Sequence, residues 1–515
     1  MELKTLFLSP FTATFEIEND SPYFVPHAYE VLLDGEKKIA GGRKNVFSLE
    51  GLTSDKEHHL SLKTEKEVLE LNFRTPKVNY VLTVKDFGAK GDGETDDTLA
   101  IQAAIMACPP DGVVYFPKGN YRFKNIFLKN DLQIYLPQGS RLVASPNRED
   151  YPVLPGVLRG KDGERLIGTW EGNPLAIYAS PLTGLYAERV RIFGGGEIDC
   201  SANLGPWWMA PKKKFLGFRP RGIFLNHCRD VVLQGITLKN TASWAIHPFY
   251  SAELGFYDLK IFNPHDAPNT DGLNPESSQN IKIIGVHFSV GDDCIAIKSG
   301  KIYMARKHLR PTANLLIRNC LMERGHGAVV FGSEISGGAE NVTVSKCVFR
   351  ETDRGLRIKT RRGRGNRPIN NIVFKNIRME GVENALVINM FYNCDPDGKT
   401  EYVYSKNPLP VDERTPVLGS FRFQDISAEN TKVSAGYFYG LPESPIQEIS
   451  LENIRVDYSE EEVWGKPAMM SFIEDHSKLG FYFNNVACVK IKNVTLAGQR
   501  GEEFIFENVR DIDKN

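Results

Sequence analysis

A short apolar pattern recurs from about residue 185 to the end of the chain, and it restricts the fold more than any other feature of the sequence. Each copy has two strand-like runs broken by Gly, Asn or Lys, with apolar residues at alternate positions. Central copies lie roughly 23 to 34 residues apart, the size of one unit in a solenoid. The copies are residues 231–236, 281–286, 315–320, 342–347, 372–377, 449–454 and 489–494. Because no helix-length pattern separates them, we predict an all-β chain that folds as a right-handed parallel β-helix.

The first 78 residues have a different pattern, which predicts a separate domain. Alternating runs are followed by turn signals, of which Asp34-Gly35 is the clearest, as is typical of a small antiparallel β-sandwich. A Leu-x-Gly-Leu turn at 49–52 resembles the penultimate loop of fibronectin type III domains. We therefore expect a fibronectin type III-like β-sandwich at 1–78, with a spacer or docking role, and a parallel β-helix at 79–515.

Composition argues against several classes of partner. The 63 Lys and Arg nearly balance the 64 Asp and Glu, and no apolar run reaches the roughly 20 residues of a membrane span, so we expect no nucleic-acid or membrane partner. None of the eight cysteines forms a CxxC pair, which argues against zinc, and buried free thiols are favoured over a disulfide framework. The N-terminus lacks the apolar core of a signal peptide, so a cytoplasmic location is expected, or a secreted or periplasmic one if a leader has been removed. The oligomeric state stays open.

Three aspartates in the strand-rich part of the chain, Asp271, Asp292 and Asp293, form the main candidate site. Strands disfavour Asp, and like charges on neighbouring strands repel, so the fold gains nothing from them. Coils of a parallel β-helix stack about 4.8 Å apart, and Asp271 precedes the other two by about one coil. Gly291 predicts a bend that lets Asp292 and Asp293 reach one cleft. The alternative is that all three cap strand ends, and their clustering disfavours it.

Basic residues follow these aspartates at the same spacing. His326 lies about one coil further on, between two glycines, and Arg357 and Lys359 lie about one coil beyond it. Crowded carboxylates cannot all ionise easily, so at least one is expected to have a raised pKa and to hold a proton near neutral pH. Glycoside hydrolysis needs carboxyl groups in two protonation states, because one acid protonates the leaving oxygen while a carboxylate base activates water. The two cations would attract an anionic sugar.

Four motifs in this order resemble the signature motifs of glycoside hydrolase family 28, the polygalacturonases. They are Asn269-Thr270-Asp271, Gly291-Asp292-Asp293, Gly325-His326-Gly327 and Arg357-Ile358-Lys359. The resemblance covers about residues 80–515 and implies a pectin lyase-like β-helix that hydrolyses α-1,4-linked galacturonate with inversion, without a metal or other cofactor. In relatives that cleave the rhamnogalacturonan backbone the last two motifs are usually altered, so their presence here favours homogalacturonan.

The resemblance also implies catalytic roles for four residues. Asp292 would be the general acid. Asp271 and Asp293 would position and deprotonate the attacking water. His326 would tune the acid and bind substrate.

Substrate binding is implied for a further set of residues. Arg357 and Lys359 would hold a galacturonate carboxylate, and a bidentate guanidinium suits a planar carboxylate better than a lone ammonium does. Asn269 belongs to the first motif and is expected to contact substrate. Tyr392 resembles a substrate-contacting tyrosine of the family, with core packing as the equal alternative.

The mode of cleavage is predicted from the added segments. Bacterial exo-acting members of the family have an N-terminal fibronectin-like domain and large insertions, which the N-terminal domain and the insertions at 146–175 and 200–221 resemble. We therefore expect an exo-acting polygalacturonase. The alternatives are an endo-polygalacturonase, a rhamnogalacturonan-type hydrolase and a non-catalytic carbohydrate-binding β-helix. A pectate lyase would need calcium and an arginine base, which the motifs do not indicate.

Other polar and aromatic groups have structural interpretations beside functional ones. Asp96 and Asp97 precede a predicted helix near Thr98, so helix capping accounts for both. The arginines at 354–367 predict a groove for a polyanionic sugar, with a solvated loop as the alternative. Tryptophans at 207, 208 and 244, the last with His247, would either stack on sugar rings or fill the core.

Overall fold

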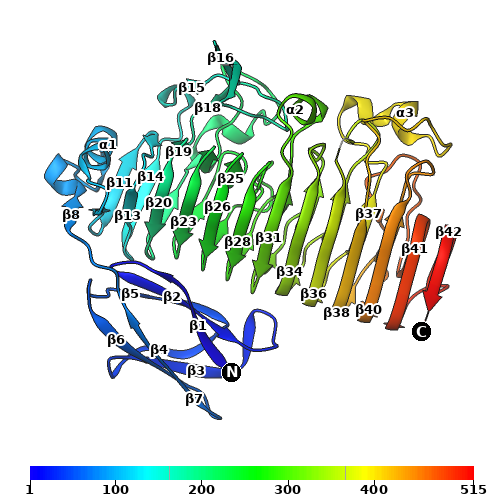
Figure 1. Ribbon diagram of the computed structural model, residues 1–515, viewed down its shortest axis with the longest axis horizontal. Helices are drawn as coiled ribbons and strands as arrows, with labels where there is room; N and C mark the ends of the chain where they lie inside the picture. The colour runs from blue at the N-terminus through cyan, green and yellow to red at the C-terminus, as the bar shows by residue number, and fades with distance from the viewer. Residues whose placement is uncertain (162, 366, 515) are drawn as a thin grey trace.

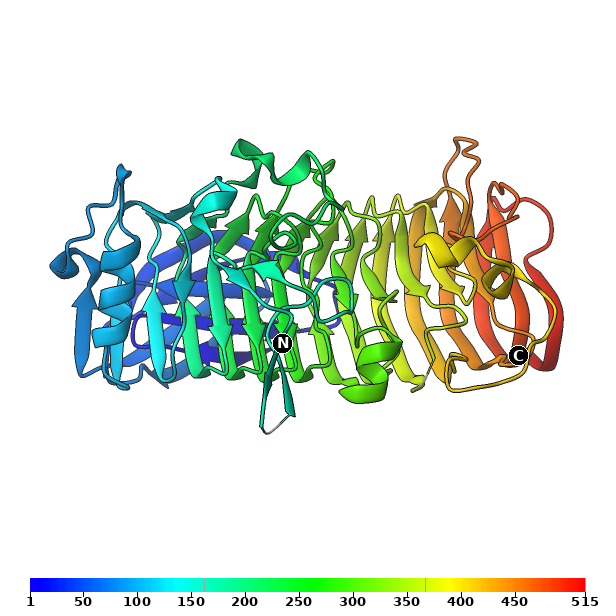
Figure 2. The same ribbon diagram turned by 90° about the horizontal axis from the view of Figure 1, so that it is seen from above.

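The computed structural model describes residues 1–161, 163–365 and 367–514, and its main body is a row of stacked coils (Figure 1). Each coil adds strands to parallel columns that run along the length of the body (Figure 2). All of the strand pairs that link successive coils are parallel, and they join 27 strands into one continuous sheet that is coiled on itself. The predicted parallel β-helix is confirmed.

The strands form three columns. The first column contains β8 (Tyr80–Thr83), β10 (Gly112–Tyr115), β13 (Leu132–Tyr135), β20 (Glu188–Phe193), β23 (Arg229–Gln234), β26 (Ala252–Tyr257), β28 (Gln279–Ile284) and β31 (Thr312–Arg318). The second contains β9 (Asp92–Asp96), β11 (Gly119–Phe123), β14 (Ser140–Ala144), β21 (Glu197–Asp199), β24 (Thr237–Lys239), β27 (Lys260–Phe262), β29 (His287–Ser289) and β32 (Leu321–Glu323). Later coils run through both columns as long strands: β34 (Ala339–Arg350), β36 (Ile369–Glu380), β38 (Ser420–Thr431) and β40 (Ile446–Tyr458).

The third column carries the face that matters for function. Its strands are β12 (Ile126–Phe127), β19 (Leu182–Leu185), β22 (Ile223–Asn226), β25 (Ile246–Phe249), β30 (Ile295–Ile297), β33 (Val329–Gly332), β35 (Arg354–Lys359), β37 (Asn384–Asn389) and β39 (Ser434–Tyr439). The last strands, β41 (Leu479–Ala497) and β42 (Phe504–Lys514), join this column to the first. Leu273 bridges β25 to β30, so the column is continuous across the Asp271 coil.

The apolar repeat of the sequence explains the stack. Equivalent residues of successive coils pair in register, and their side chains fill the interior of the coil. In the first column this series is Val231, Leu254, Ile281, Leu315, Val342, Ile372, Phe421, Ile449 and Val489, all buried. Each coil therefore buries its apolar face only against its neighbours, as in other solenoids.

Helices are short and lie outside the columns. They are α1 (Thr98–Ala107), α2 (Ile302–Lys307) and α3 (Glu401–Tyr404), with 3₁₀ turns η1 (Val84–Phe87), η2 (Arg148–Asp150), η3 (Ala202–Leu204), η4 (Pro206–Trp208) and η5 (Pro396–Lys399). Helix α1 covers the first coils, where its buried residues join the main core. Asp96 accepts a hydrogen bond from the backbone N–H of Thr98 at the start of the helix, as the capping prediction requires. The prediction is wrong for the side chain of Asp97, which makes no capping hydrogen bond and instead accepts two from the turn at Lys90 and Gly91, so both aspartates are structural.

The insertion at 146–175 folds over the outward face of the third column. It contains β15 (Val153–Leu154), β16 (Val157–Gly160) and β17 (Gly163–Leu166), and β18 (Ile177–Tyr178) follows it. Its apolar residues, with those of β22, β25 and α2, form a second core outside the coil: Leu154, Leu166, Ile167, Trp170, Phe224, Phe249 and Met304. That part of the face is therefore buried, and the outward face is open only beyond it.

The first 74 residues form two antiparallel sheets, as the β-sandwich prediction requires. One has the order β1 (Glu2–Leu8), β2 (Thr12–Glu18), β5 (Val46–Glu50), and the other β4 (Glu36–Lys44), β3 (Phe24–Leu33), β6 (Glu57–Lys63), β7 (Val68–Arg74). A separate apolar cluster lies between them. We propose the domain boundary at residue 78, between β7 and β8, and the fibronectin type III-like assignment stays a prediction.

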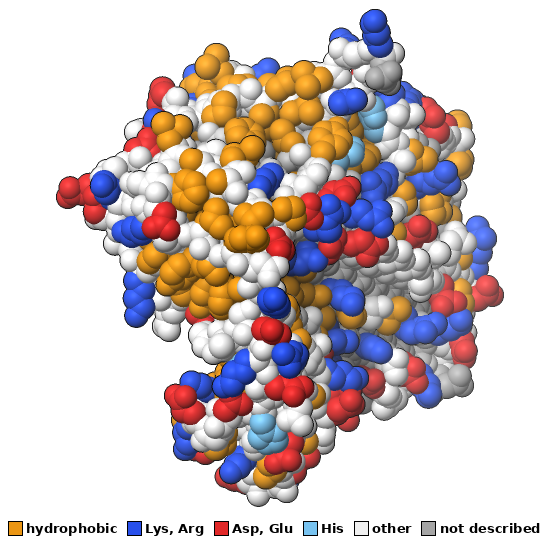
Figure 3. All heavy atoms as spheres, turned by 60° about the vertical axis from the view of Figure 1, so that its left-hand side comes forward, with side chains coloured by type: hydrophobic (Ala, Val, Ile, Leu, Met, Phe, Trp, Pro, Cys, Tyr) orange, Lys and Arg blue, Asp and Glu red, His pale blue; other side chains and the backbone are white. Residues whose placement is uncertain are grey.

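Positive and negative side chains are interspersed over the face of the molecule in Figure 3, so no single charge dominates it.

The sandwich docks along the side of the β-helix. Glu16 is buried at this interface, where its carboxylate accepts hydrogen bonds from Arg318 at 2.6 and 2.8 Å and from Asn319 at 2.6 Å. Thr12 donates to Gln234 at 2.9 Å, and Ser48 donates to Asp258 at 2.7 Å. Backbone N–H groups complete the contact, from Tyr23 to Lys346 O and from Gln138 to Glu50.

We expect the Glu16→Ala variant to be destabilised by about 2 kcal/mol. The substitution leaves Arg318 without its partner, and the loss is below the 3–5 kcal/mol of a fully buried pair because Arg318 remains partly exposed. Urea unfolding followed by intrinsic fluorescence measures the change. Glu18→Ala is the matched control, because Glu18 lies on the same strand but pairs with Lys4 at the surface. Equal losses in both variants would contradict the interface role of Glu16.

Two further sequence expectations concern cysteines and membranes. All eight cysteines are free thiols, and six of them are buried, as expected from their scattered positions. Within the described residues, none of the helices has the length and apolar character that crossing a membrane requires. The comparisons reported below give the expected cytoplasmic location no support, and it stays a prediction.

Candidate active site

The three aspartates lie at the start of the third column on two successive coils. Asp271 precedes Leu273, and Asp292 with Asp293 precede β30 on the next coil. The backbone N–H of Gly272 donates to the carbonyl of Asp293 at 3.0 Å, which sets the two coils in register. The one-coil spacing predicted from the sequence is therefore what the backbone shows.

A bend brings both adjacent aspartates to one cavity. Residues 291 and 292 form a bend ahead of β30, so Asp292 and Asp293 do not alternate as they would on a regular strand. Gly291 is required there, because a Cβ would lie 2.4 Å from the carbonyl oxygen of Ala267 and 2.6 Å from that of Pro264. This confirms the bend predicted at Gly291.

All eight predicted site residues line one cavity of about 250 Å³. They are Asn269, Asp271, Asp292, Asp293, His326, Arg357, Lys359 and Tyr392. Trp244, which the sequence analysis named as a candidate for stacking on sugar, also lines the cavity, and the lining residues that the sequence interpretation missed are Glu171, Lys212, Lys298, Ser333, Glu334, Cys394, Asp395 and Met469. Of these, Lys298 had a usable signal, because it alternates with the inward Ile295 and Ile297 and so faces outward beside the aspartates.

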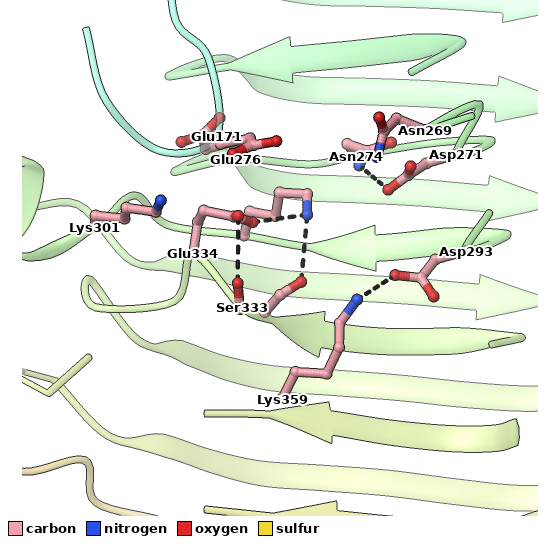
Figure 4. Close-up of polar contacts among 12 residues, drawn as sticks. Glu171, Asn269, Asp271, Asn274, Glu276, Asp293, Lys301, Ser333, Glu334 and Lys359 are labelled. Atoms are coloured by element: carbon pink, nitrogen blue, oxygen red, sulfur yellow. Dashed lines mark hydrogen bonds and ion pairs between the residues drawn. The ribbon is translucent and has the colours of Figure 1, made fainter. Parts of the chain in front are cut away.

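The three carboxylates are in close contact range. One oxygen from each of Asp271, Asp292 and Asp293 lies within 4.8 Å of the other two. Asp271 accepts a hydrogen bond from Asn274 at 2.8 Å (Figure 4), and the side-chain amide of Asn269 lies 3.5 Å from Asp292. Three carboxylates at this distance repel one another strongly in a buried cavity, so the cluster retains a proton near neutral pH.

Burial and charge assign that proton in the free protein to Asp271. Burial raises the pKa of Asp271 to about 8, and the charges of Asp292 and Asp293 add to the effect. Burial also acts on Asp292, but the hydrogen bond with His326 and the positive charges of Lys359 and Arg357 outweigh it and hold the pKa of Asp292 at about 2. One carboxylate has a raised pKa, as expected, but it is that of Asp271, and burial contributes more to the shift than crowding does.

Cations of the next coils surround Asp292 and Asp293. Nδ1 of His326 lies 3.4 Å from Asp292, and the hydrogen bond to that carboxylate raises the pKa of the imidazole. Lys359 donates to Asp293 at 2.6 Å, and a guanidinium nitrogen of Arg357 lies 3.5 Å from the same carboxylate (Figure 4 shows the Lys359 contact). Arg357 also lies 6.0 Å from the ring centroid of Tyr392. The cavity therefore holds carboxylates and cations in nearly equal number.

A second group of charges lies beside the three aspartates. Lys298 is buried and donates to Glu334 at 2.9 Å, and Lys301 and Arg364 lie 3.3 and 2.6 Å from Asp395. In Figure 4 Glu334 and Lys301 of this group lie on the opposite side of the view from Asp271 and Asp293. Burial lowers the pKa of Lys298, but the charge of Glu334 and the hydrogen bond with it contribute to raising the pKa above its ordinary value, so Lys298 remains an ammonium.

The arginine-rich stretch at 354–367 is not the groove that the sequence predicts. Arg361, Arg362 and Arg364 are buried, and each pairs with an acidic residue of a distant loop. The partners are Asp397 for Arg361, Glu443 for Arg362 and Asp395 for Arg364. The pairs with Asp395 and Asp397, together with hydrogen bonds from Arg362 to the carbonyls of residues 402, 405 and 407, hold the loop at 394–413 in place, so the function of these arginines is structural.

The aromatic residues named from the sequence divide between core and cavity. Trp207 packs against Tyr151 and Tyr178 in a buried cluster. Trp244 lines the cavity, with the ammonium of Lys298 4.6 Å from its ring centroid. His247 is fully buried and bonded to Glu276 at 2.9 Å, away from the cavity lining.

Comparison with known proteins gives the same assignment as the motifs. The sequence profile of Glycosyl hydrolases family 28 matches residues 168–470, and the profile of Rhamnogalacturonase A/epimerase, pectate lyase-like, matches residues 81–135. A probable polygalacturonase of Vitis vinifera is 30% identical over 384 residues, which cover 72% of this chain and 73% of that protein.

Two solved structures share the fold. The family 28 exopolygalacturonase of Yersinia enterocolitica aligns over 99% of this chain and 98% of its own, with a TM-score of 0.71 and 19% identity. The exopolygalacturonase of Thermotoga maritima aligns over 83% of this chain and 94% of its own, with a TM-score of 0.65 and 26% identity. With its catalytic motifs assembled in one cavity and the family profile matched over more than half of its length, this chain belongs to family 28 of the glycosyl hydrolases.

Proposed function

We propose that this protein hydrolyses the α-1,4-galacturonosidic bonds of polygalacturonate and its oligomers, and that it acts from the chain end. The observation that carries the proposal is the buried cluster of Asp271, Asp292 and Asp293 beside Arg357 and Lys359, in a cavity that the insertion at 146–175 walls on one side. Carboxylates supply acid and base, and the two cations suit a galacturonate carboxylate. The Vitis relative is named a probable polygalacturonase and the Thermotoga structure an exopolygalacturonase, which supports polygalacturonate as the substrate and action from the chain end.

Substrate binding gives Asp292 the proton that a general acid needs. In the free protein Arg357, Lys359 and His326 keep Asp292 ionised while Asp271 holds the proton. A substrate carboxylate bound to Arg357 and Lys359 neutralises those charges, so the proton moves to Asp292 and leaves Asp271 ionised. Asp292 then protonates the leaving oxygen, and Asp271 with Asp293 takes a proton from water. The cluster gains one proton and loses one, so it returns to its starting state.

We propose that the anomeric configuration is inverted. The carboxylate oxygens lie within 4.8 Å, which is closer than the roughly 6.5–9.5 Å usual for inverting enzymes. A retaining enzyme, however, needs only two carboxylates, one of them a nucleophile, whereas three allow two to hold a water and the third to act as acid. The third carboxylate therefore favours inversion.

A time course of polygalacturonate and trigalacturonate digestion tests the proposal. With EDTA present throughout, we expect monogalacturonate from the earliest points, no new absorbance near 235 nm, and a first-formed product of inverted anomeric configuration by ¹H NMR. EDTA is expected to leave the rate unchanged, because Lys298, Arg357 and Lys359 already supply positive charge to the cluster.

The other outcomes each remove a part of the proposal. Mixed oligomers at early times would show endo action, and retention would make one aspartate a nucleophile. Rising absorbance would show elimination by a lyase. No reaction with either substrate would overturn the function.

A further inference from the structure

The tip of the insertion at 146–175 is a tight turn that reaches the cavity. Trp170 and Asn173 form a two-residue hairpin through reciprocal backbone hydrogen bonds of 2.9 and 3.1 Å, with Glu171 and Gly172 at its tip. Trp170 stacks on Phe218 with ring centroids 4.9 Å apart and anchors the turn in the second core. The side chain of Glu171 is thereby held in the cavity wall.

The backbone at the tip is specialised for this approach. Glu171 has φ +44° and Gly172 has φ +71°, both in the left-handed region, which non-glycine residues seldom adopt. The carbonyl of Gly172 accepts from the backbone N–H of Lys301 at 2.9 Å, and a Cβ on Gly172 would lie 2.7 Å from Cβ of Glu334. The turn is therefore packed against the coil that carries Glu334.

Glu171 differs from the other carboxylates of the cavity. Asp271, Asp292, Asp293, Glu334 and Asp395 each have a hydrogen-bonding or ionic partner, named above. Glu171 is mostly buried, yet among the described residues its carboxylate forms neither a hydrogen bond nor an ion pair. In Figure 4 Glu171 lies above Glu334, on the side of the view away from Asp271. Burial and the charge of Glu334 raise the pKa of Glu171, because an unpaired carboxylate is unfavourable in its charged form at this buried position.

We propose that Glu171 is a specificity residue that binds the hydroxyl groups of the terminal sugar unit and excludes a further galacturonate. The inference rests on the proposed function. A carboxylate is an acceptor only, so it suits sugar hydroxyls and repels a second carboxylate. Lys298 already pairs with Glu334, and Lys301 and Arg364 already pair with Asp395, so a chain extended past this point would bring its next carboxylate against the unpaired carboxylate of Glu171. Cations bind the reacting unit at Arg357 and Lys359, whereas the unpaired carboxylate of Glu171 defines where the chain must end.

Kinetics with three trimers test the inference. The substrates are trigalacturonate, its analogue with an unsaturated non-reducing end that lacks the terminal hydroxyl at C4, and trigalacturonate reduced at the opposite end. We expect the wild type to disfavour one of the two altered trimers by roughly 100-fold in kcat/KM, since a site built for a hydroxyl rejects its absence. We expect Glu171→Ala to reduce that discrimination at least tenfold, and Glu171→Gln to keep part of it.

Controls separate this role from structural ones. Glu149→Ala changes an exposed carboxylate of the same insertion and is expected to keep wild-type discrimination. Lys212→Ala tests whether Glu171 serves only to pair with the nearby lysine, in which case both variants would lose discrimination equally and the inference would fail. Thermal unfolding checks that each variant is folded.

The failure of this inference is distinguishable from failure of the proposed function. If the wild type hydrolyses the trimers and Glu171→Ala keeps its preference, Glu171 is not the specificity residue but the function stands. The same holds if the wild type does not distinguish the altered ends. If the wild type hydrolyses no trimer, the proposed function itself is overturned.

Discussion

Replacing Asp292 by Asn is expected to lower the rate of polygalacturonate hydrolysis by roughly 10²–10⁴-fold, the contribution of a positioned general acid. The amide has the size of the carboxylate but cannot donate a proton to the leaving oxygen in the same way. The fold should be retained, since the amide can still meet Asn269 and His326. Initial rates with trigalacturonate, together with the thermal unfolding temperature, measure both effects.

An activated substrate makes this result specific to the acid role. A p-nitrophenyl galacturonide has a leaving group that needs no protonation, so Asp292→Asn should lose much less activity on it than on trigalacturonate. Asp266→Asn, at an exposed turn position near the site, is the matched control and should be unaffected on both. Equal losses on the two substrates would assign Asp292 a role other than proton donation.

The pH dependence of kcat/KM tests whether the aspartate cluster must retain one proton. The free protein holds it on Asp271 with a pKa of about 8, so kcat/KM of the wild type should fall as the pH rises through about 8 and the cluster loses its proton. On the acid side activity falls as the base carboxylates become protonated. A profile flat up to pH 10 would contradict a cluster that needs one retained proton.

Replacing Arg357 by Ala is expected to lower kcat/KM for trigalacturonate by roughly 30-fold or more. Truncating one partner of a buried charged contact costs about 2–5 kcal/mol, and every 1.4 kcal/mol is a factor of ten. The loss reflects both the missing guanidinium and the weaker neutralisation of Asp293 and Asp292. Steady-state kinetics on trigalacturonate measure it, and Arg357→Lys should recover only part of the loss because it cannot form a bidentate pair.

The methyl ester of trigalacturonate separates recognition from folding. The ester has no charged carboxylate, so Arg357→Ala should lose much less activity on it than on the acid. Arg367→Ala, at an exposed position outside the cavity lining, is the control and should match the wild type on both substrates. A variant that loses the same factor on acid and ester would show that Arg357 supports the structure of the site and does not read the carboxylate.

The sequence predicts the catalytic cluster well because the fold converts spacing into position. Coils stack at a nearly constant distance, so residues one repeat apart become neighbours. Leu273, Ile295, Val329 and Leu356 pair in register, and this alone brings Asp271, Asp293, His326 and Arg357 to one cavity. The prediction therefore required only contacts between neighbouring coils.

The cavity wall could not be predicted in the same way, because it comes from loops without a period. Glu171 reaches Glu334 through an insertion that leaves the stack, and nothing in the spacing relates the two. The arginines at 361, 362 and 364 show the same limit, since their partners Asp395, Asp397 and Glu443 lie in loops that a local pattern cannot place. A run of cations therefore indicated a groove where the structure has buried pairs.

The sequence also could not predict which aspartate holds the proton that the cluster retains. Crowding predicts that one carboxylate has a raised pKa, and the motifs imply that Asp292 is the acid. The structure places His326 and Lys359 beside Asp292 but leaves Asp271 buried behind Asn274, so the free protein stores the proton on the other residue. Which aspartate holds it depends on contacts from three coils at once.

The docked N-terminal sandwich changes how the stack resists unwinding. In a solenoid each coil touches only its neighbours, so the ends can fray independently of the middle. The sandwich makes contacts with Gln138, Gln234, Asp258, Arg318 and Lys346, which belong to coils spread over more than half of the body. The sandwich therefore links these coils to one another, and one coil in that span cannot open without straining the contacts of the others. The coils that carry the three aspartates lie inside that span, so the sandwich protects their geometry although none of the described residues that line the cavity belongs to it.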